Sequence, residues 1–233
     1  MTDNAASKPF NAFSIKVLAC LFMLTDHIGW QLFPGQDIWR LIGRLAFPLF
    51  AFMIANGWLH SRDRGKYFLR LALCALLIQW PYWKFISSGS LNIFFTLSLG
   101  LAAIWLWERQ KESGALAGGL SVLAVALIAE VVGADYGWYG VLLIFTSHLF
   151  YGRTPKLFAA WLALNAAFMF YVFFAFYTSE DVLPAVVLYQ PFSLLALLII
   201  ANYNGRKGRK GGWLFYVFYP LHLAVIYLVG LYL

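Results

Sequence analysis

Residues 15–33 read IKVLACLFMLTDHIGWQLF, an apolar run long enough to cross a membrane as one helix. The run nevertheless contains three ionisable residues, Lys16, Asp26 and His27. A charged side chain costs roughly 2.5–3.5 kcal/mol near the bilayer centre, so a helix that only anchored the chain would not carry three such residues. The run therefore predicts a transmembrane helix that also serves a polar site.

The spacing of these residues assigns them to faces of the helix. Lys16 and His27 are eleven positions apart in the chain. At about 100° per residue this is roughly 20° beyond three full turns, so the two share a face about 16 Å apart along the axis. Asp26 points about 100° away from His27, and these neighbours cannot form a side-by-side acid–base pair.

The composition indicates an all-α, polytopic integral membrane protein. Of 233 residues, 62% are hydrophobic and 12% are charged, and the mean hydropathy is +0.73. A soluble domain of this size cannot bury so much apolar surface, and the runs lack the period-two alternation of a membrane β-barrel. The net charge of +7 fits topogenic basic loops, so membrane lipid rather than nucleic acid is the expected partner. Two cysteines are too few to suggest a metal site.

We predict a cytoplasmic N-terminal segment, residues 1–13, and a single transmembrane helical domain, residues 14–233. About nine spans in one bundle are expected at 15–33, 38–59, 66–86, 91–107, 114–132, 137–151, 155–177, 184–202 and 213–232. In this arrangement the loops on the N-terminal side contain twelve basic residues, and those on the other side contain Lys84. The positive-inside rule therefore places the N-terminus in the cytoplasm and the C-terminus outside.

Unusual polar residues gather in the outer half of this predicted bundle. Arg40 and Arg44 begin the second span one turn apart, with Asp37 as its expected N-cap, and Asp26 could balance either arginine. Glu130 ends the fifth span. The other chamber residues, with His27, are Gln79, Asn92, Asp135, Tyr136, Gln190 and His222. Polar groups in a membrane face the bundle interior or a wet cavity, so these residues predict a polar chamber.

This chamber suggests a reaction centre. A neutral imidazole at His27 could act as a general base or as a transient acyl acceptor. A carboxylate could fix its tautomer, and Glu130 or Asp135 suits that task better than Asp26. The two arginines could stabilise an oxyanion, and Lys16, below the chamber on the cytoplasmic side, could bind a phosphate of a long donor.

Each of these residues also has a structural interpretation. His27 could make a hydrogen bond between helices, Arg40 and Arg44 could be interfacial anchors, and Glu130 could be a solvated helix end. The basic cluster at 206–210 is expected to serve topology or lipid contact. Two further histidines at predicted cytoplasmic helix ends are expected to be solvated: His60 and His148.

Several short motifs follow one another along nearly the whole chain. They are Leu24-Thr25-Asp26-His27-Ile28-Gly29, Arg40-Leu41-Ile42-Gly43-Arg44-Leu45-Ala46-Phe47-Pro48, Gln79-Trp80-Pro81, Leu91-Asn92-Ile93-Phe94-Phe95-Thr96-Leu97, Asp135-Tyr136-Gly137, Tyr203-Asn204-Gly205 and Tyr219-Pro220-Leu221-His222-Leu223. In order and coverage they resemble the TraX family of membrane proteins, which is associated with N-terminal acetylation of F-type pilin. The resemblance implies a bacterial inner-membrane protein of conjugation or fimbrial assembly.

A narrower likeness concerns the first helix. Lys16-x10-His27 is similar to the Arg/Lys-x10-His signature of acyltransferase-3 proteins, which are held to move acyl groups from cytoplasmic acyl-CoA to acceptors across the membrane. This likeness implies acetyl-CoA as donor and His27 as a catalytic residue. We accordingly expect catalysis by His27, Asp26 and Glu130, and donor binding by Lys16, Arg40 and Arg44.

The sequence and these resemblances together imply a membrane acetyltransferase that acts on the N-terminal amine of a pilin or on another membrane-presented acceptor. O-acetylation of a glycan or lipid is an alternative acceptor chemistry. Two alternatives of other classes are a proton-coupled transporter, since intramembrane ionisable residues also mark ion pathways, and a pilus-assembly scaffold. Against the transporter, the sequence shows no inverted repeat.

Overall fold

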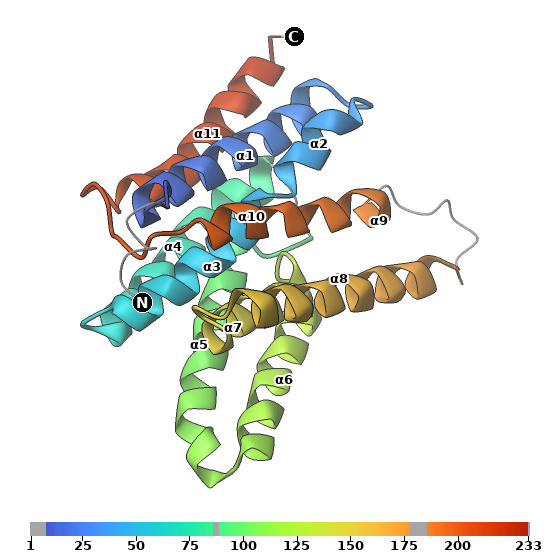
Figure 1. The fold of residues 1–233 in the computed structure, drawn as a ribbon. Coiled ribbons are helices and arrows are strands. Elements are labelled where there is room, and N and C mark those ends of the chain that lie inside the picture. Colours follow the sequence, from blue (N-terminus) through green and yellow to red (C-terminus); the bar gives the residue numbers. More distant parts are fainter. Residues whose placement is uncertain (1–7, 86–88, 178–185, 233) are drawn as a thin grey trace. The chain divides into compact units, whose positions relative to one another are not determined.

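The computed structural model describes residues 8–85, 89–177 and 186–232, and every named element within these ranges is helical (Figure 1). Two isolated β-bridges, Phe10–Tyr203 and Leu91–Ala134, are the extended pairings recorded there. The predicted all-helical fold is confirmed for these residues. They form two compact units, one consisting of Ile54–Arg153 and the other of the chain before and after that stretch.

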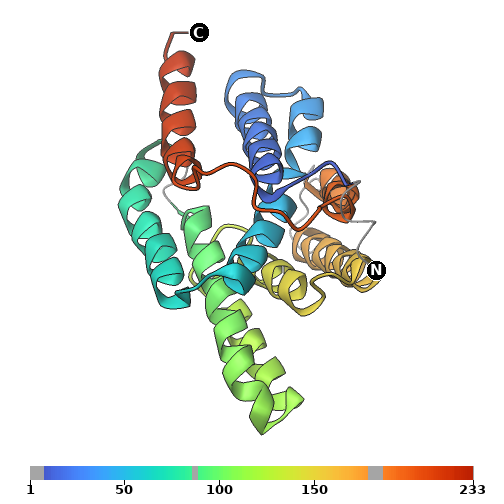
Figure 2. The same cartoon turned by 60° about the vertical axis from the view of Figure 1, so that its left-hand side comes forward.

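The unit made from both parts of the chain is built around α1. Its helices are α1 (Ala12–Leu32), α2 (Asp37–Gly43), α8 (Thr154–Tyr177), α9 (Val186–Tyr189), η2 (Gln190–Leu195, a 3₁₀-helix), α10 (Ala196–Ala201) and α11 (Leu214–Gly230). α3 (Ala46–His60) begins in this unit and ends in the other. Figure 2 shows α1 between α2 and α11, and it packs against both.

The start of α1 is fixed by its own cap and by a distant loop. The Asn11 side chain accepts a hydrogen bond from the amide of Ser14, and the Ser14 hydroxyl accepts one from the amide of Asn11, which is a capping box. The amide of Ala12 donates to the carbonyl of Arg206 at 2.8 Å. The loop that precedes α11 is therefore attached to the beginning of α1.

Two glycines allow α1 and α2 to pack closely. A Cβ atom at Gly29 would lie 2.1 Å from Cβ of Trp39, and one at Gly43 would lie 2.3 Å from Cβ of Asp26. Real Cβ atoms do not approach so closely, so a larger residue at either glycine would separate the helices. The side chain of Asp26 consequently lies directly on the backbone of α2.

The unit from Ile54 to Arg153 is a contiguous set of helices arranged around α5. They are α4 (Arg64–Phe85), α5 (Ile93–Gln110), η1 (Lys111–Ser113, a 3₁₀-helix), α6 (Ala115–Val131) and α7 (Gly137–Leu149). α5 packs against α4, α6 and α7, and Leu101 and Ile104 on α5 are fully buried. A Cβ atom at Gly100 would lie 2.5 Å from Cδ1 of Ile144, so this glycine sets the close approach of α5 and α7.

Within the described residues, three helical stretches are long and apolar enough to cross a membrane: Ala12–Leu32, Asp37–His60 and Thr154–Ala175. Three further apolar helices are shorter: Ala115–Val131, Gln190–Ala201 and Leu214–Gly230. These helices support the prediction of a helical membrane protein. They do not support the predicted count of nine spans.

Local chemistry explains much of this difference. The predicted span 38–59 is retained as the candidate stretch Asp37–His60, although a turn separates the end of α2 at Gly43 from the start of α3 at Ala46. Where a span was expected at 184–202, the described residues form α9, η2 and α10, and Pro191 lies within η2. Proline has no amide to donate and disfavours a continuous α-helix. Basic residues lower the hydropathy of α4: Arg64, Lys66, Arg70 and Lys84.

Some predicted boundaries extend beyond the residues that can be described. Residues 1–7 of the predicted N-terminal segment fall there, as do residue 86 of the third span and residues 184–185 of the eighth. One predicted helix start is wrong by one position: Gln36 is the N-cap of α2, and Asp37 is the first helical residue.

Candidate functional site

Two predicted site residues, far apart in the chain, lie side by side between α1 and α11. Nδ1 of His27 is 2.8 Å from Nε2 of His222, a hydrogen-bonding distance. Nδ1 of His222 is in turn 2.8 Å from the carbonyl oxygen of Phe218, one helical turn earlier. His222 is 5% exposed, whereas His27 is only partly buried. The structure therefore forms a histidine pair that is anchored at one end by a backbone carbonyl.

The predicted shared face of Lys16 and His27 is confirmed. Nζ of Lys16 lies 5.5 Å from the ring centroid of Phe215, a cation–π contact. Phe215 and His222 both belong to α11, so α1 turns the side that carries Lys16 and His27 toward this helix. The helix period of 3.6 residues is sufficient to produce this arrangement.

Asp26 lies against the arginines of the second predicted span, as the sequence suggested. Its Oδ2 is 2.7 Å from Nη1 of Arg40, and its Oδ1 is 3.9 Å from Nη2 of Arg44. Arg44 is 9% exposed. Both Oδ1 of Asp26 and Nε of Arg44 are buried without a hydrogen-bond partner among the described residues. One carboxylate thus faces two guanidinium groups, and a donor on the more buried arginine is available.

Gln79 and Asn92 form a hydrogen-bonded pair in the unit from Ile54 to Arg153. The Asn92 side-chain amide donates to Oε1 of Gln79 and to the carbonyl of Ala75, each at 2.8 Å. Oδ1 of Asn92 accepts from the amide of Phe94 and caps α5. Asn92 is fully buried, and all of these polar atoms are engaged in positioning α4 and the start of α5. Their place in a substrate chamber stays a prediction.

Glu130, Asp135 and Tyr136 shape the turn between α6 and α7. Oε2 of Glu130 accepts a hydrogen bond from the amide of Trp138 at 3.2 Å, in the first turn of α7. Tyr136 has a φ of 63°, a left-handed conformation that is rare for a residue with a side chain. The carbonyl of Asp135 accepts a hydrogen bond from the hydroxyl of Thr96. Roles for these residues in catalysis or in a chamber stay predictions.

Gln190 lies in the 3₁₀ segment that replaces part of the eighth predicted span. Its side chain is 2% exposed. In the same segment the Ser193 hydroxyl donates to Oδ1 of Asn165 on α8 at 3.0 Å. This polar contact between η2 and α8 is buried, so the segment is held by specific hydrogen bonds as well as by apolar packing.

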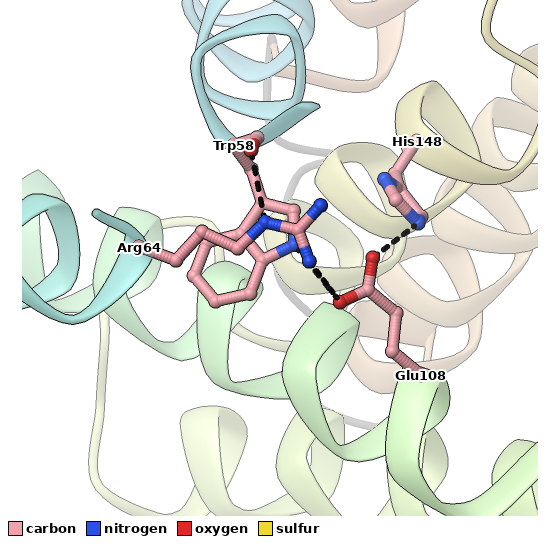
Figure 3. Close-up of polar contacts among 4 residues, drawn as sticks. All are labelled: Trp58, Arg64, Glu108 and His148. Atoms are coloured by element: carbon pink, nitrogen blue, oxygen red, sulfur yellow. Dashed lines mark hydrogen bonds and ion pairs between the residues drawn. The ribbon is translucent and has the colours of Figure 1, made fainter. Parts of the chain in front are cut away.

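A charged cluster that the sequence interpretation missed lies at one end of the unit from Ile54 to Arg153 (Figure 3). Oε2 of Glu108 accepts hydrogen bonds from Nη1 of Arg64 at 2.9 Å and from Nε1 of Trp58 at 3.3 Å. Oε1 of Glu108 lies 3.6 Å from Nε2 of His148. Arg64 also donates to the carbonyl of Trp58 and covers its ring. Glu108 therefore joins the ends of α3, α4, α5 and α7.

His148 was expected to be solvated, and this expectation is wrong. Its side chain is 11% exposed and pairs with Glu108. His60, by contrast, is exposed as expected, and its Nδ1 lies 2.9 Å from the carbonyl of Asn56. A sequence signal for the cluster existed, because the predicted topology already placed Arg64, Glu108 and His148 at helix ends on one side of the membrane.

The residues that could hold an acyl donor are Lys16 on α1 and the two arginines that contact Asp26, Arg40 and Arg44. Within the described ranges, no group of three or more His, Cys, Asp or Glu side chains is placed to hold a metal ion. The arrangement provides the oriented imidazole of His27, an available donor on the guanidinium of Arg44, and the ammonium of Lys16 on the same face of α1 as His27. These are groups that acid–base and acyl-transfer chemistry can use.

The family model described as TraX protein matches residues 12–230. The chain is 31% identical to the probable fimbrial assembly protein FimC, serogroup H1, of Dichelobacter nodosus, over 93% of this chain and 94% of that protein. It is 28% identical to Protein TraX of Escherichia coli, over 93% of this chain and 86% of that protein. No solved structure matches the chain. With a family match that spans α1 through α11, the chain belongs to the TraX protein family.

Proposed function

We propose that this chain is a multi-pass acetyltransferase of the bacterial inner membrane, with its N-terminus in the cytoplasm and its C-terminus in the periplasm. It transfers an acetyl group from cytoplasmic acetyl-CoA to an acceptor at the outer side of the membrane, the N-terminal amine of a pilin. The names of two relatives support a role connected with pili, since one is a probable fimbrial assembly protein and the other is Protein TraX.

The observation that carries the proposal is the arrangement of α1 against α11. Lys16 and His27 both face α11, and the ring of His27 is held there by His222. By helix geometry the two residues are about 16 Å apart along the axis. A long donor could therefore bind Lys16 through a phosphate while its thioester reaches His27. The likeness of this pair to the acyltransferase-3 signature suggests the same use.

The direction of two helices supports the proposed orientation. Phe13, at the start of α1, contacts Phe215 at the start of α11, while His27 contacts His222 farther along both helices. The two helices therefore run in the same direction, and their starts lie together. The basic loop 206–210 is attached to the start of α1, which places its charges on the side proposed as cytoplasmic.

The reaction can use His27 in two ways. As a base, His27 accepts a proton from the acceptor amine while the amine nitrogen attacks the thioester carbonyl carbon. The oxyanion then collapses, the C–S bond breaks, and the departing thiolate receives that proton as CoA. As an acyl carrier, the imidazole nitrogen attacks the thioester carbonyl carbon and the C–S bond breaks to release the thiolate. The amine then attacks the acetyl group, the bond between the acetyl carbon and the imidazole breaks, and the proton lost by the amine passes to the thiolate to give CoA. Both routes require an imidazole nitrogen with a free lone pair.

Arg44 has a donor available to stabilise the oxyanion. It is nearly buried, its Nε has no hydrogen-bond partner within the described ranges, and Asp26 is bonded more closely to Arg40. A buried donor without an acceptor is unfavourable in the resting protein and becomes favourable when negative charge develops beside it. The same cation would serve transfer to a hydroxyl, so O-acetylation of a glycan or lipid is the alternative reaction.

The test uses the full chain in proteoliposomes with an F-type pilin inserted in the same bilayer and acetyl-CoA labelled in the acetyl group. We expect the intact mass of the pilin to rise by one acetyl group, and the label to stay off the pilin with His27→Ala. His60→Ala is the matched control, because His60 is exposed at a helix end. Label found in a lipid or glycan fraction, and not on the pilin, would support O-acetylation as the reaction. The absence of any labelled product would contradict the proposed acetyltransferase activity.

A further inference from the structure

The hydrogen bonds of the histidine pair determine where its protons lie. A carbonyl oxygen can only accept, so the contact between Phe218 and Nδ1 of His222 requires a proton on that nitrogen. A neutral imidazole carries one N–H, which leaves Nε2 of His222 as an acceptor. The 2.8 Å contact with His27 therefore requires that Nδ1 of His27 donates. In the neutral pair, Nε2 of His27 is left with a free lone pair.

From this chain of contacts we infer that His222 is a positioning residue, which fixes the tautomer of His27 so that Nε2 of His27 is the reacting nitrogen. The inference rests on the proposed acetyl transfer and adds to it the identity of the reacting atom and of the residue that orients it. The sequence favoured a carboxylate, Glu130 or Asp135, as the orienting group. In the structure, Nδ1 of His27 is already bonded to an imidazole.

An imidazole partner has a physical advantage at this place. An aspartate or glutamate would orient the ring equally well but would bring a second charge into an apolar helix contact, where an unpaired charge is costly. His222 is 5% exposed and does the same without a net charge. The pair can also hold no more than one extra proton, because two protonated rings would direct N–H toward N–H across the 2.8 Å contact. When Nε2 of His27 accepts a proton from the acceptor amine, this one extra proton makes His27 an imidazolium. The imidazolium can then donate the proton to the leaving thiolate.

The two rings also place the reacting nitrogen on the more accessible member of the pair. His222 is buried, and both of its nitrogens are engaged by Phe218 and His27. His27 is partly exposed, and Nδ1 is the nitrogen that faces α11. Since the two ring nitrogens point in different directions from the ring, Nε2 of His27 points away from this contact. Substrate can then approach Nε2 without displacing His222.

The first arm of the test reads the tautomer directly, without substrate. The chain has four histidines, so ¹⁵N-histidine labelling in nanodiscs gives few signals, each assignable by one substitution. We expect a pyrrole-type nitrogen at Nδ1 and a pyridine-type nitrogen at Nε2 for His27. His222→Gln keeps an acceptor oxygen near the position of Nε2 and should retain this pattern. His222→Phe keeps a ring without an acceptor and should allow the opposite tautomer of His27.

The second arm measures acetyl transfer by the same variants. His222→Phe should lower kcat by roughly 10²-fold while KM for acetyl-CoA changes little. His222→Gln, which keeps an acceptor, should lower kcat by no more than about 10-fold. His60→Phe is the matched ring substitution at an exposed site. Thermal unfolding of each purified variant establishes that it is folded before kcat is compared. If the Phe variant does not fold, His222→Leu, which also lacks an acceptor, takes its place in both measurements.

Two outcomes would overturn the inference: the opposite tautomer of His27 in the unmodified chain, or an unchanged kcat in a folded His222→Phe variant. These outcomes are separate from a failure of the proposed function. If His27 has the expected tautomer but no acetyl group is transferred to any acceptor, the proposed acetyltransferase activity is contradicted. A chain that transfers acetyl groups with the opposite tautomer overturns the role of His222 alone.

Discussion

Oδ2 of Asp26 lies 2.7 Å from Nη1 of Arg40, and this ion pair joins α1 to α2 immediately beside His27. The contact depends on Gly43, because a Cβ atom there would occupy the space of the Asp26 side chain. The ion pair next to the proposed reaction centre therefore depends on the close packing of α1 against α2. Its role can be tested by changing either the charge of its residues or the packing of the two helices.

Changing the charge tests whether Asp26 compensates the arginines. Asp26→Asn leaves Arg40 and Arg44 without a carboxylate, so we expect the free energy of unfolding to fall by about 2–3 kcal/mol. Thermal and denaturant unfolding in detergent measure this loss. A second substitution, Arg40→Gln, should recover part of it, since the double variant removes an unpaired charge. Full additivity of the two losses would contradict the pairing.

Asp63→Asn is the matched control for that experiment. Asp63 lies between α3 and α4, outside the candidate spans, and pairs with Lys66 at 3.2 Å on an exposed surface. The backbone amide of Lys66 and then its side chain hold the pKa of Asp63 below its ordinary value, so it stays ionised at neutral pH. Exposed pairs of this kind contribute little, and we expect no measurable loss of stability.

Changing the crossing tests the role of close packing. Gly43→Ala places a methyl group 2.3 Å from Cβ of Asp26, and we expect it to lower the free energy of unfolding by about 1–3 kcal/mol and to reduce acetyl transfer. Gly119→Ala on α6 is the control, because nothing lies within 4 Å of its added Cβ. Alanine is the better helix former, so this variant should be neutral or slightly stabilised. Equal losses in the two variants would argue against a requirement for close packing.

The charged cluster of Figure 3 gives a prediction about stability. Glu108 accepts from Trp58 and Arg64 and lies beside His148, so Glu108→Gln should lower the free energy of unfolding by about 2–3 kcal/mol. The Arg64 side chain is 42% exposed, so Arg64→Gln should cost less than about 1 kcal/mol.

Unfolding measurements on these variants and on Glu112→Gln, an exposed residue of the adjacent 3₁₀ turn, test this ranking. A larger loss for Arg64 than for Glu108 would show that the guanidinium stacked on Trp58 holds the cluster, rather than the carboxylate.

Lys16 provides a prediction about the donor. If its ammonium binds a phosphate of acetyl-CoA, Lys16→Gln should raise KM for acetyl-CoA by roughly 10-fold, while kcat changes little. Lys16→Arg keeps the charge and should restore most of the affinity. Lys66→Gln, on an exposed part of α4, is the control. An unchanged KM in the Lys16→Gln variant would exclude Lys16 from donor binding.

Features that follow from one helix could be predicted from the sequence. The shared face of Lys16 and His27 and the divergence of Asp26 come from the 3.6-residue period, and both are present in the structure. The all-helical fold follows from long apolar runs without alternation. The pairing of Asp26 with an arginine could be predicted because the helix that follows α1 was expected to pack beside it.

Features that depend on packing between distant segments could not be predicted in the same way. His27 and His222 are 195 positions apart, and the sequence placed both in one chamber without indicating their contact. The division of the eighth predicted span depends on Pro191 and on the buried contact between Ser193 and Asn165. Hydropathy counts apolar residues, but it does not distinguish a helix that faces lipid from one packed within the protein.

The division of one unit between two parts of the chain determines when the site can form during synthesis. The unit Ile54–Arg153 is contiguous and can fold as soon as it has been made, whereas α1 must wait for α11. At about 5–20 residues per second, His222, which is 195 positions after His27, is translated roughly 10–40 s later. Throughout that interval the nascent protein has His27 without its acceptor imidazole, so the proposed reaction centre is completed late, when α11 packs against α1.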